Sequence, residues 1–150
     1  MSLRQWASNG WVVAHTTSAT EIQDLFDLAD RDLADCQTAR LSDDWRFGIA
    51  CNAALQLATA ALYASGYKPA RGQSHHLRAV QSLEFTIAAD ATLVNQFDAF
   101  RAKRNTGTYD RAGAVSRAEA DEMRTLAKTL RKRIAAWLTA NHPPLAPRER

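Results

Sequence analysis

The spacing of apolar residues along the chain predicts five helices. Ser18 and Glu21 form a capping-box pattern that opens the first helix, which should reach about Thr38. Within it, apolar residues recur every three or four positions, as on a helix with one buried face. These residues are Ile22, Leu25, Phe26, Ala29, Leu33 and Cys36.

The second predicted helix has a different pattern. It begins after Ser42 with two acidic residues, should run to about Ala64 and ends at Gly66. Because it is rich in alanine and apolar nearly all round, we expect it to be the central helix. One polar stripe interrupts the pattern and predicts either a wet groove or a hydrogen-bonded contact with another helix or subunit. The stripe consists of Asn52, Gln56, Thr59 and Tyr63.

Three further helices are expected to begin near Ser74, Asp90 and Ser116, and to reach about residues 88, 106 and 141. Gly107 should stop the fourth helix, and a loop through Gly113 should follow it. Short loops join the helices, and no segment shows the alternation of a strand. The sequence therefore predicts an all-α fold, an antiparallel up-and-down bundle of about five helices over residues 18–141.

The segments on either side of this bundle lack helical periodicity. We interpret residues 1–17 as an irregular arm or short helix that packs through Trp6 and Trp11, with self-association as an alternative use of these indoles. Residues 142–150 are rich in proline, so we expect a disordered tail.

Composition fits a single domain. A chain of 150 residues with 46% hydrophobic content can bury one core without disulfides. Cys36 and Cys51 lie in apolar helical stretches, which favours reduced, buried thiols. No signal-peptide pattern is present, and no stretch looks apolar over the roughly 20 residues of a membrane span, so we expect a cytoplasmic protein without a membrane partner.

Motifs for cofactors and metals are absent from the sequence. It has no glycine-rich phosphate loop and no paired metal-ligand motif, so no cofactor is expected. The adjacent His75 and His76 are a poor metal pair, because neighbouring side chains on a helix diverge by about 100°.

Charge is unevenly distributed, although the formal net charge is only +3. Residues 21–44 are mainly acidic, and residues 101–133 are mainly basic. The basic segment predicts either a face for an anionic ligand or an ordinary solvated surface, and the two segments could also pack side by side.

The most informative stretch lies at the start of the basic segment. Arg101, Lys103 and Arg104 end the predicted fourth helix, where the helix dipole favours cations whatever their function. Asn105 and Tyr109 follow around Gly107. A fixed cation, an amide and a phenol together suit a phosphate and its neighbouring ribose or base, so we predict a nucleotide- or nucleic-acid-binding site here.

These residues resemble the motif of the HEPN superfamily, in which an Arg is followed by a polar residue and, a few positions later, by a His. Arg104 matches the Arg, Asn105 matches the polar residue, and Tyr109 stands where the His is expected. Residues 42–47, 64–67 and 75–76 also look like the small stand-alone branch of this superfamily. The resemblance extends over roughly residues 18–138 and implies a HEPN-like helical fold.

The same resemblance implies a function and partners. HEPN ribonucleases cleave RNA without a metal, their motifs commonly converge at a homodimer groove, and many act in toxin-antitoxin systems beside a nucleotidyltransferase. The catalytic set would be Arg104, Asn105 and Tyr109, with Arg101 and Lys103 as further RNA- or nucleotide-binding residues. An unperturbed Tyr has a pKa near 10, against about 6.5 for His, which makes Tyr109 a poor general base.

Three interpretations follow. The first is a homodimer that binds RNA or a nucleotide, with or without ribonuclease activity. The second is a non-catalytic interaction module for a nucleotidyltransferase, using the tryptophan arm and the polar stripe. The third is a structural bundle in which Arg104 pairs with acids of the first helix.

Overall fold

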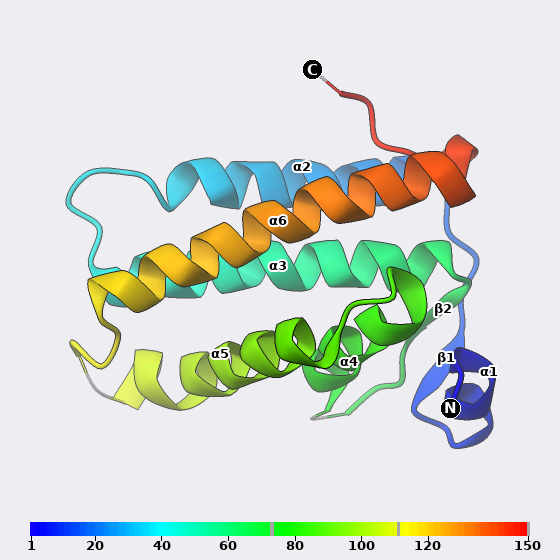
Figure 1. Ribbon diagram of the computed structural model, residues 1–150, viewed down its shortest axis with the longest axis horizontal. Helices are drawn as coiled ribbons and strands as arrows, with labels where there is room; N and C mark the ends of the chain where they lie inside the picture. The colour runs from blue at the N-terminus through cyan, green and yellow to red at the C-terminus, as the bar shows by residue number, and fades with distance from the viewer. Residues whose placement is uncertain (73, 111, 150) are drawn as a thin grey trace.

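The computed structural model describes residues 1–72, 74–110 and 112–149, with the backbone alone at 106–110. Over these residues the protein is mostly helical, with six α-helices packed together and a small two-stranded sheet (Figure 1). The elements are α1 (Leu3–Ser8), β1 (Val12–Ala14), α2 (Ala19–Asp35), α3 (Asp43–Ala64), β2 (Tyr67–Pro69), α4 (His75–Thr86), α5 (Ala91–Asp110), α6 (Arg117–Asn141) and the 3₁₀ turn η1 (Pro143–Leu145).

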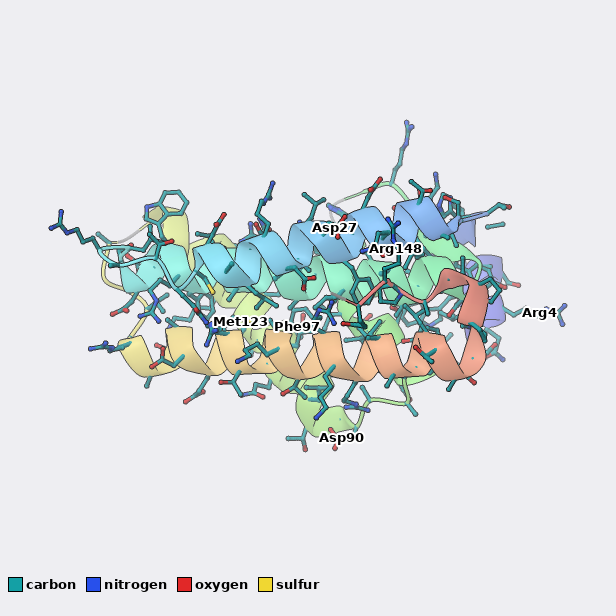
Figure 2. All side chains as sticks on the ribbon, turned by 90° about the horizontal axis from the view of Figure 1, so that it is seen from above. Arg4, Asp27, Asp90, Phe97, Met123 and Arg148 are labelled. Carbon is teal, nitrogen blue, oxygen red and sulfur yellow. The ribbon has the colours of Figure 1, made fainter. Side chains whose placement is uncertain are left out.

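The helix α3 is central, as its composition predicted. It contacts α2 and α6 on one side and α4 and α5 on the other (Figure 1). Its many alanines are fully buried and allow neighbouring helices to approach closely. Large buried side chains from the surrounding helices complete the core; among them are Phe26, Phe97, Met123 and Leu130, and Figure 2 labels Phe97 and Met123.

By length and composition α3 is apolar enough to cross a membrane, contrary to our sequence interpretation. The hydropathy of α3 is not obvious from its sequence, because much of it comes from alanine, which is only weakly hydrophobic. In the bundle, 72% of its most apolar window is buried by other parts of the chain. That degree of burial is typical of the central helix of a packed domain.

Most helix starts agree with the predicted caps. The Ser18, Ser42 and Ser116 side chains each accept a backbone N–H three residues later, and Asp90 caps α5 through the Leu93 N–H at 2.9 Å. The capping box at Ser116 is complete. The expected box at Ser18 is only half formed, because the carboxylate that should complete it bonds to residues of the N-terminal arm instead.

Several predicted boundaries were wrong. Ser74 makes no capping hydrogen bond, and α4 ends at Thr86, two residues early. Gly107 does not stop α5, which continues to Asp110. A single glycine costs a helix only about 1 kcal/mol, which the sixteen residues before it can offset.

The N-terminal arm is more regular than expected. The strands β1 and β2 pair antiparallel, with Val13 opposite Lys68, so the expectation of no strand was wrong. Strands of three residues are too short to show alternation. The helix α1 places Trp6, which is only 4% exposed, edge-on to Phe85 of α4 with ring centroids 5.2 Å apart. The indole packing that we predicted is therefore confirmed, and Trp6 is used inside the chain.

Residues 142–149 also differ from the expected disordered tail. The prolines end α6 but begin η1, after which Leu145 and Ala146 pack against the core. The Arg148 backbone N–H donates to the Gln23 side chain at 2.7 Å. Apolar side chains between the prolines give this segment a place between α2 and α6 (Figure 2).

Candidate functional site

The predicted site residues lie on the C-terminal half of α5. The Arg101 and Arg104 side chains are partly buried, and Asn105 is exposed. Arg101 donates through Nε to Asp98 one turn earlier, at 2.8 Å, and is only 16% exposed. This ion pair holds the Arg101 guanidinium against the bundle rather than in solvent.

Of the other two predicted residues, only Lys103 has a described side chain. Lys103 forms an ion pair with Glu119 at the start of α6 and so tethers α5 to α6. The Tyr109 side chain lies outside the described residues. Because α5 continues where a glycine turn was expected, positions 104 and 109 are about 140° apart around a helix, whereas 105 and 109 share a face.

Arg104 points toward the middle of α3. Its guanidinium is placed to hydrogen-bond with the Cys51 thiol, and Arg101 lies near the same sulfur. Burial raises the pKa of Cys51 to about 11, and the two cations oppose this rise only in part. The thiol is therefore neutral at physiological pH. In the described part of the chain Arg104 forms no ion pair with the acids of α2, so the pairing expected for a purely structural role is not observed.

His76 of α4 also lies within the influence of the same two arginines. Burial lowers the pKa of its imidazole, and the nearby charges of His75, Arg104 and Arg101 lower it further. The His75 and His76 rings also contact each other, tilted by 51° with centroids 3.9 Å apart. At neutral pH His76 is therefore uncharged and has a nitrogen lone pair that can accept a proton.

A pocket of about 420 Å³ opens beside the two histidines. Its wall is formed by Thr59 and Tyr63 of the polar stripe, by Lys68 of β2, by Arg71 in the loop after β2, and by the start of α4. Gln56 precedes Thr59 by three residues in the same stripe, and its Oε1 is buried without a hydrogen-bond partner among the described residues. The polar stripe thus lines a groove over part of its length. Its chemistry suits a polar or anionic ligand.

The N-terminal arm packs against Tyr63, which lines this pocket. His15 Nε2 lies 2.7 Å from Glu21 Oε1, and the His15 ring packs on Tyr63 with centroids 4.4 Å apart. Burial pushes the pKa of Glu21 upward, but hydrogen bonds from Thr17 and His15 outweigh it, and the net pKa is lowered. Burial and the Glu21 charge raise the pKa of Tyr63. The N-terminal arm therefore packs on a Tyr63 phenol that is neutral at physiological pH.

Sequence reasoning missed the roles of Cys51 and His76 beside Arg104. Helical periodicity places both on inward faces, but it does not say which helix faces which. The histidine pair at the start of a helix was the available signal. Within 1–72, 74–110 and 112–149, no group of three or more His, Cys, Asp or Glu side chains could hold a metal ion.

Comparisons of the chain with protein-family models, with curated proteins and with solved structures found no match. The functional argument therefore rests on the residues themselves.

Proposed function

We propose that this chain is a cytoplasmic HEPN-type homodimer that binds RNA or a nucleotide at the junction of α3, α4 and α5. Arg104 and Asn105 would hold the phosphate, Arg101 would add a second positive charge, and Tyr109 would complete the motif. Arg101 and Lys103 contribute less than Arg104, because they already pair with Asp98 and Glu119. The mostly helical bundle with a central α3 is compatible with a HEPN-like, up-and-down arrangement.

One observation carries the proposal. Arg104 and Arg101 lie close enough to His76 to lower its pKa, and His76 also lines the neighbouring pocket. Two guanidinium groups near His76, together with Lys68 and Arg71 in the lining of the pocket, suit a phosphodiester whose base or ribose enters the pocket. The geometry favours this reading over a helix end that merely collects cations.

The same arrangement supports a metal-independent ribonuclease of toxin-antitoxin type. His76, neutral at physiological pH, would take the proton from a ribose 2′-hydroxyl as that oxygen attacks the adjacent phosphorus. The 5′-oxygen would leave and gain a proton from water, giving a 2′,3′-cyclic phosphate. Arg104 would stabilise the charge that develops on the phosphate. His76 would thus provide an imidazole in place of the motif histidine, whose position is held by Tyr109.

The test is to incubate purified protein with mixed single-stranded RNA in EDTA and to follow binding and cleavage in the same samples. Arg104→Ala should abolish both, and Arg4→Ala, on the distant α1, should change neither. His76→Gln and Tyr109→Phe separate the two possible proton carriers, because loss of cleavage with retained binding identifies the residue that acts. Unchanged RNA and nucleotide binding by Arg104→Ala would refute the site. Absence of both activities in the wild type would favour the interaction-module alternative.

A further inference from the structure

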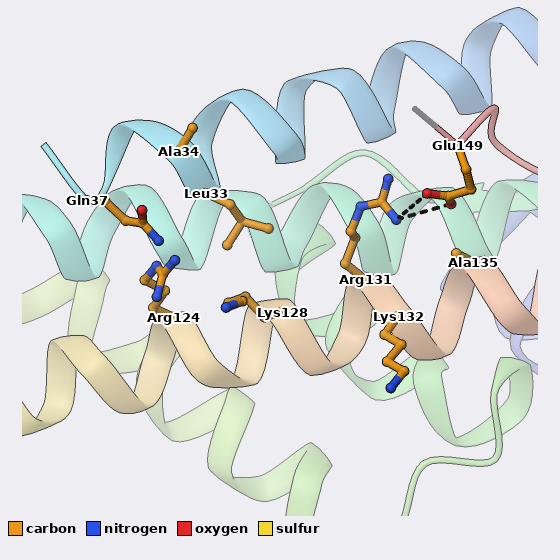
Figure 3. A pocket seen from close by; sticks show the side chains of 9 residues that line it. All are labelled: Leu33, Ala34, Gln37, Arg124, Lys128, Arg131, Lys132, Ala135 and Glu149. Atoms are coloured by element: carbon orange, nitrogen blue, oxygen red, sulfur yellow. Dashed lines mark hydrogen bonds and ion pairs between the residues drawn. The ribbon is translucent and has the colours of Figure 1, made fainter.

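A second groove lies between α2 and α6 (Figure 3), which pack on the opposite side of α3 from α5 (Figure 1). Its volume is about 580 Å³, and Leu33 of α2 and Ala135 of α6 are among its apolar lining residues. The α6 wall is cationic over more than two turns. Its cations are Arg124, Lys128, Arg131 and Lys132.

Two of these four cations are already engaged. Arg131 makes a bidentate pair with Asp30 of α2, at 2.7 and 3.1 Å. Arg124 lies beside the Gln37 side-chain amide, whose oxygen accepts from the guanidinium once the amide is turned over. Lys128 and Lys132 are exposed and, among the described residues, have no ion-pair or hydrogen-bond partner. Because they are four residues apart, they present two free positive charges on one helix face.

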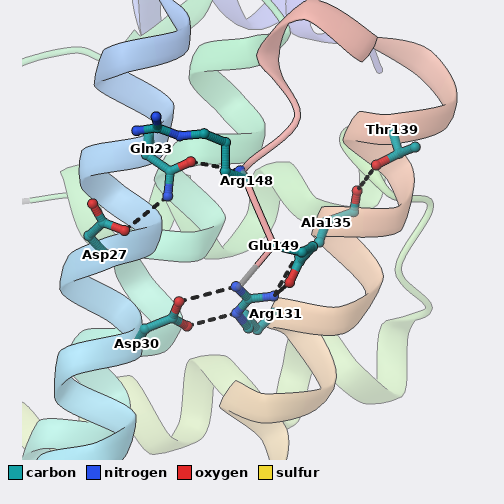
Figure 4. Close-up of polar contacts among 8 residues, drawn as sticks. All are labelled: Gln23, Asp27, Asp30, Arg131, Ala135, Thr139, Arg148 and Glu149. Carbon is teal, nitrogen blue, oxygen red and sulfur yellow. Dashed lines mark hydrogen bonds and ion pairs between the residues drawn. The ribbon is translucent and has the colours of Figure 1, made fainter.

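The chain's own residues 147–149 occupy one end of this groove (Figure 4). Pro147 is buried, the Arg148 N–H donates to Gln23, and Glu149 accepts from Arg131 at 3.3 Å. The Glu149 carboxylate is 65% exposed, so its pair with Arg131 is weak and easily exchanged. The groove therefore already receives a non-helical peptide segment that carries a side-chain carboxylate, that of Glu149.

From this seated segment and the two unpaired lysines, we propose that the α2–α6 groove binds an extended acidic peptide segment of a partner protein. Gln23 would accept a peptide N–H, and carboxylates would pair with Lys128 and Lys132. A further carboxylate would replace Glu149 at Arg131. The apolar floor suits a peptide, and no aromatic side chain among the described lining residues offers a stacking surface for nucleic-acid bases. The proposal is independent of the Arg104 site.

The test measures binding of a fluorescein-labelled oligoglutamate peptide by fluorescence anisotropy, with labelled oligouridine of equal length as the second probe. The charge-reversal pair Lys128→Glu/Lys132→Glu should weaken peptide binding at least about tenfold, because like charges then face the ligand. The matched pair Arg4→Glu/Arg117→Glu changes the net charge equally and should change the affinity less than about twofold. Glu149→Gln should strengthen binding by removing the competing carboxylate.

Each outcome decides the question. Loss confined to the Lys128/Lys132 pair, with gain in Glu149→Gln and no effect of Arg104→Ala, supports the proposal. Equal losses in both charge-reversed pairs mean non-specific attraction and overturn it. Tighter binding of oligouridine that is lost in the Lys128/Lys132 pair makes the groove a nucleic-acid site and also overturns it. No binding of the peptide by the folded wild-type protein refutes it.

Discussion

His76 is the titratable side chain whose charge decides what the candidate site can do. Its burial and the two nearby guanidinium groups all disfavour the imidazolium form, so its pKa lies below the ordinary 6.5. A neutral imidazole can accept a proton and does not repel Arg104 or Arg101. A protonated one would add a positive charge to a region that already holds two.

This shift predicts a pH-dependent stability. Just below pH 6.5 the unfolded chain binds a proton at this position more readily than the folded chain does. The contribution of His76 to stability is therefore fully present above pH 6.5 and is lost as the pH falls below it. His76→Gln should flatten this part of the profile, whereas His142→Gln, at the end of α6, serves as the control. Urea unfolding at a series of pH values measures the effect, and identical profiles for wild type and His76→Gln would contradict it.

At the scale of elements, Asp44 links the start of α3 to the loop between α5 and α6. Its carboxylate accepts the Gly113 N–H at 2.7 Å and the Val115 N–H at 3.1 Å. It also lies in the first turn of α3, where the helix dipole favours an anion. One side chain thus fixes the end of the bundle nearest to the motif.

Asp44→Ala should therefore destabilise the protein by about 1–3 kcal/mol, since it leaves two backbone donors without their acceptor. Asp43→Ala is the matched control. Asp43 occupies the same turn, and its one interaction with the described residues is an ion pair with Arg46 at 3.7 Å, so about 0–1 kcal/mol is expected. Denaturant unfolding of both variants measures the difference. Equal losses of stability would show that the Asp44 bonds to the loop contribute little.

The five main helices were predictable from local signals, because four of them begin with a Ser or Asp cap and most have apolar residues every three or four positions. The Ser116–Glu119 box and the alanine-rich α3 are examples. The predictions that failed concern contacts between residues that are far apart in the sequence or on separate elements. The pairing of β1 with β2 and the turn of Glu21 toward His15 join segments that sequence periodicity does not relate. Arg104 could be singled out from its local motif. Its neighbours Cys51 and His76 could not, because they lie on other helices.

At the scale of the whole molecule, the proposed homodimer needs a contact surface near the motif. Trp45 is the most exposed tryptophan among the described residues, at 57% exposure, and it follows Asp44 at the end of the bundle where the α5–α6 loop lies. An exposed indole at this position suits an interface between two copies.

We therefore expect Trp45→Arg to convert a dimer into a folded monomer. Leu28→Arg introduces the same charge at another exposed apolar position, on α2, and should leave the dimer intact. Light scattering after gel filtration gives the mass of each variant. A wild-type monomer would contradict the dimer itself, and a dimeric Trp45→Arg variant would place its interface elsewhere.

The central claim is that Arg104 contacts a phosphate of bound RNA. The most direct measurement is the affinity for a single-stranded RNA at several salt concentrations, for the wild type, Arg104→Ala and Arg4→Ala. Loss of one phosphate contact should weaken binding and reduce the slope of log affinity against log salt by about 0.7. We predict this change for Arg104→Ala alone. Coincident lines for the wild type and Arg104→Ala would contradict the account.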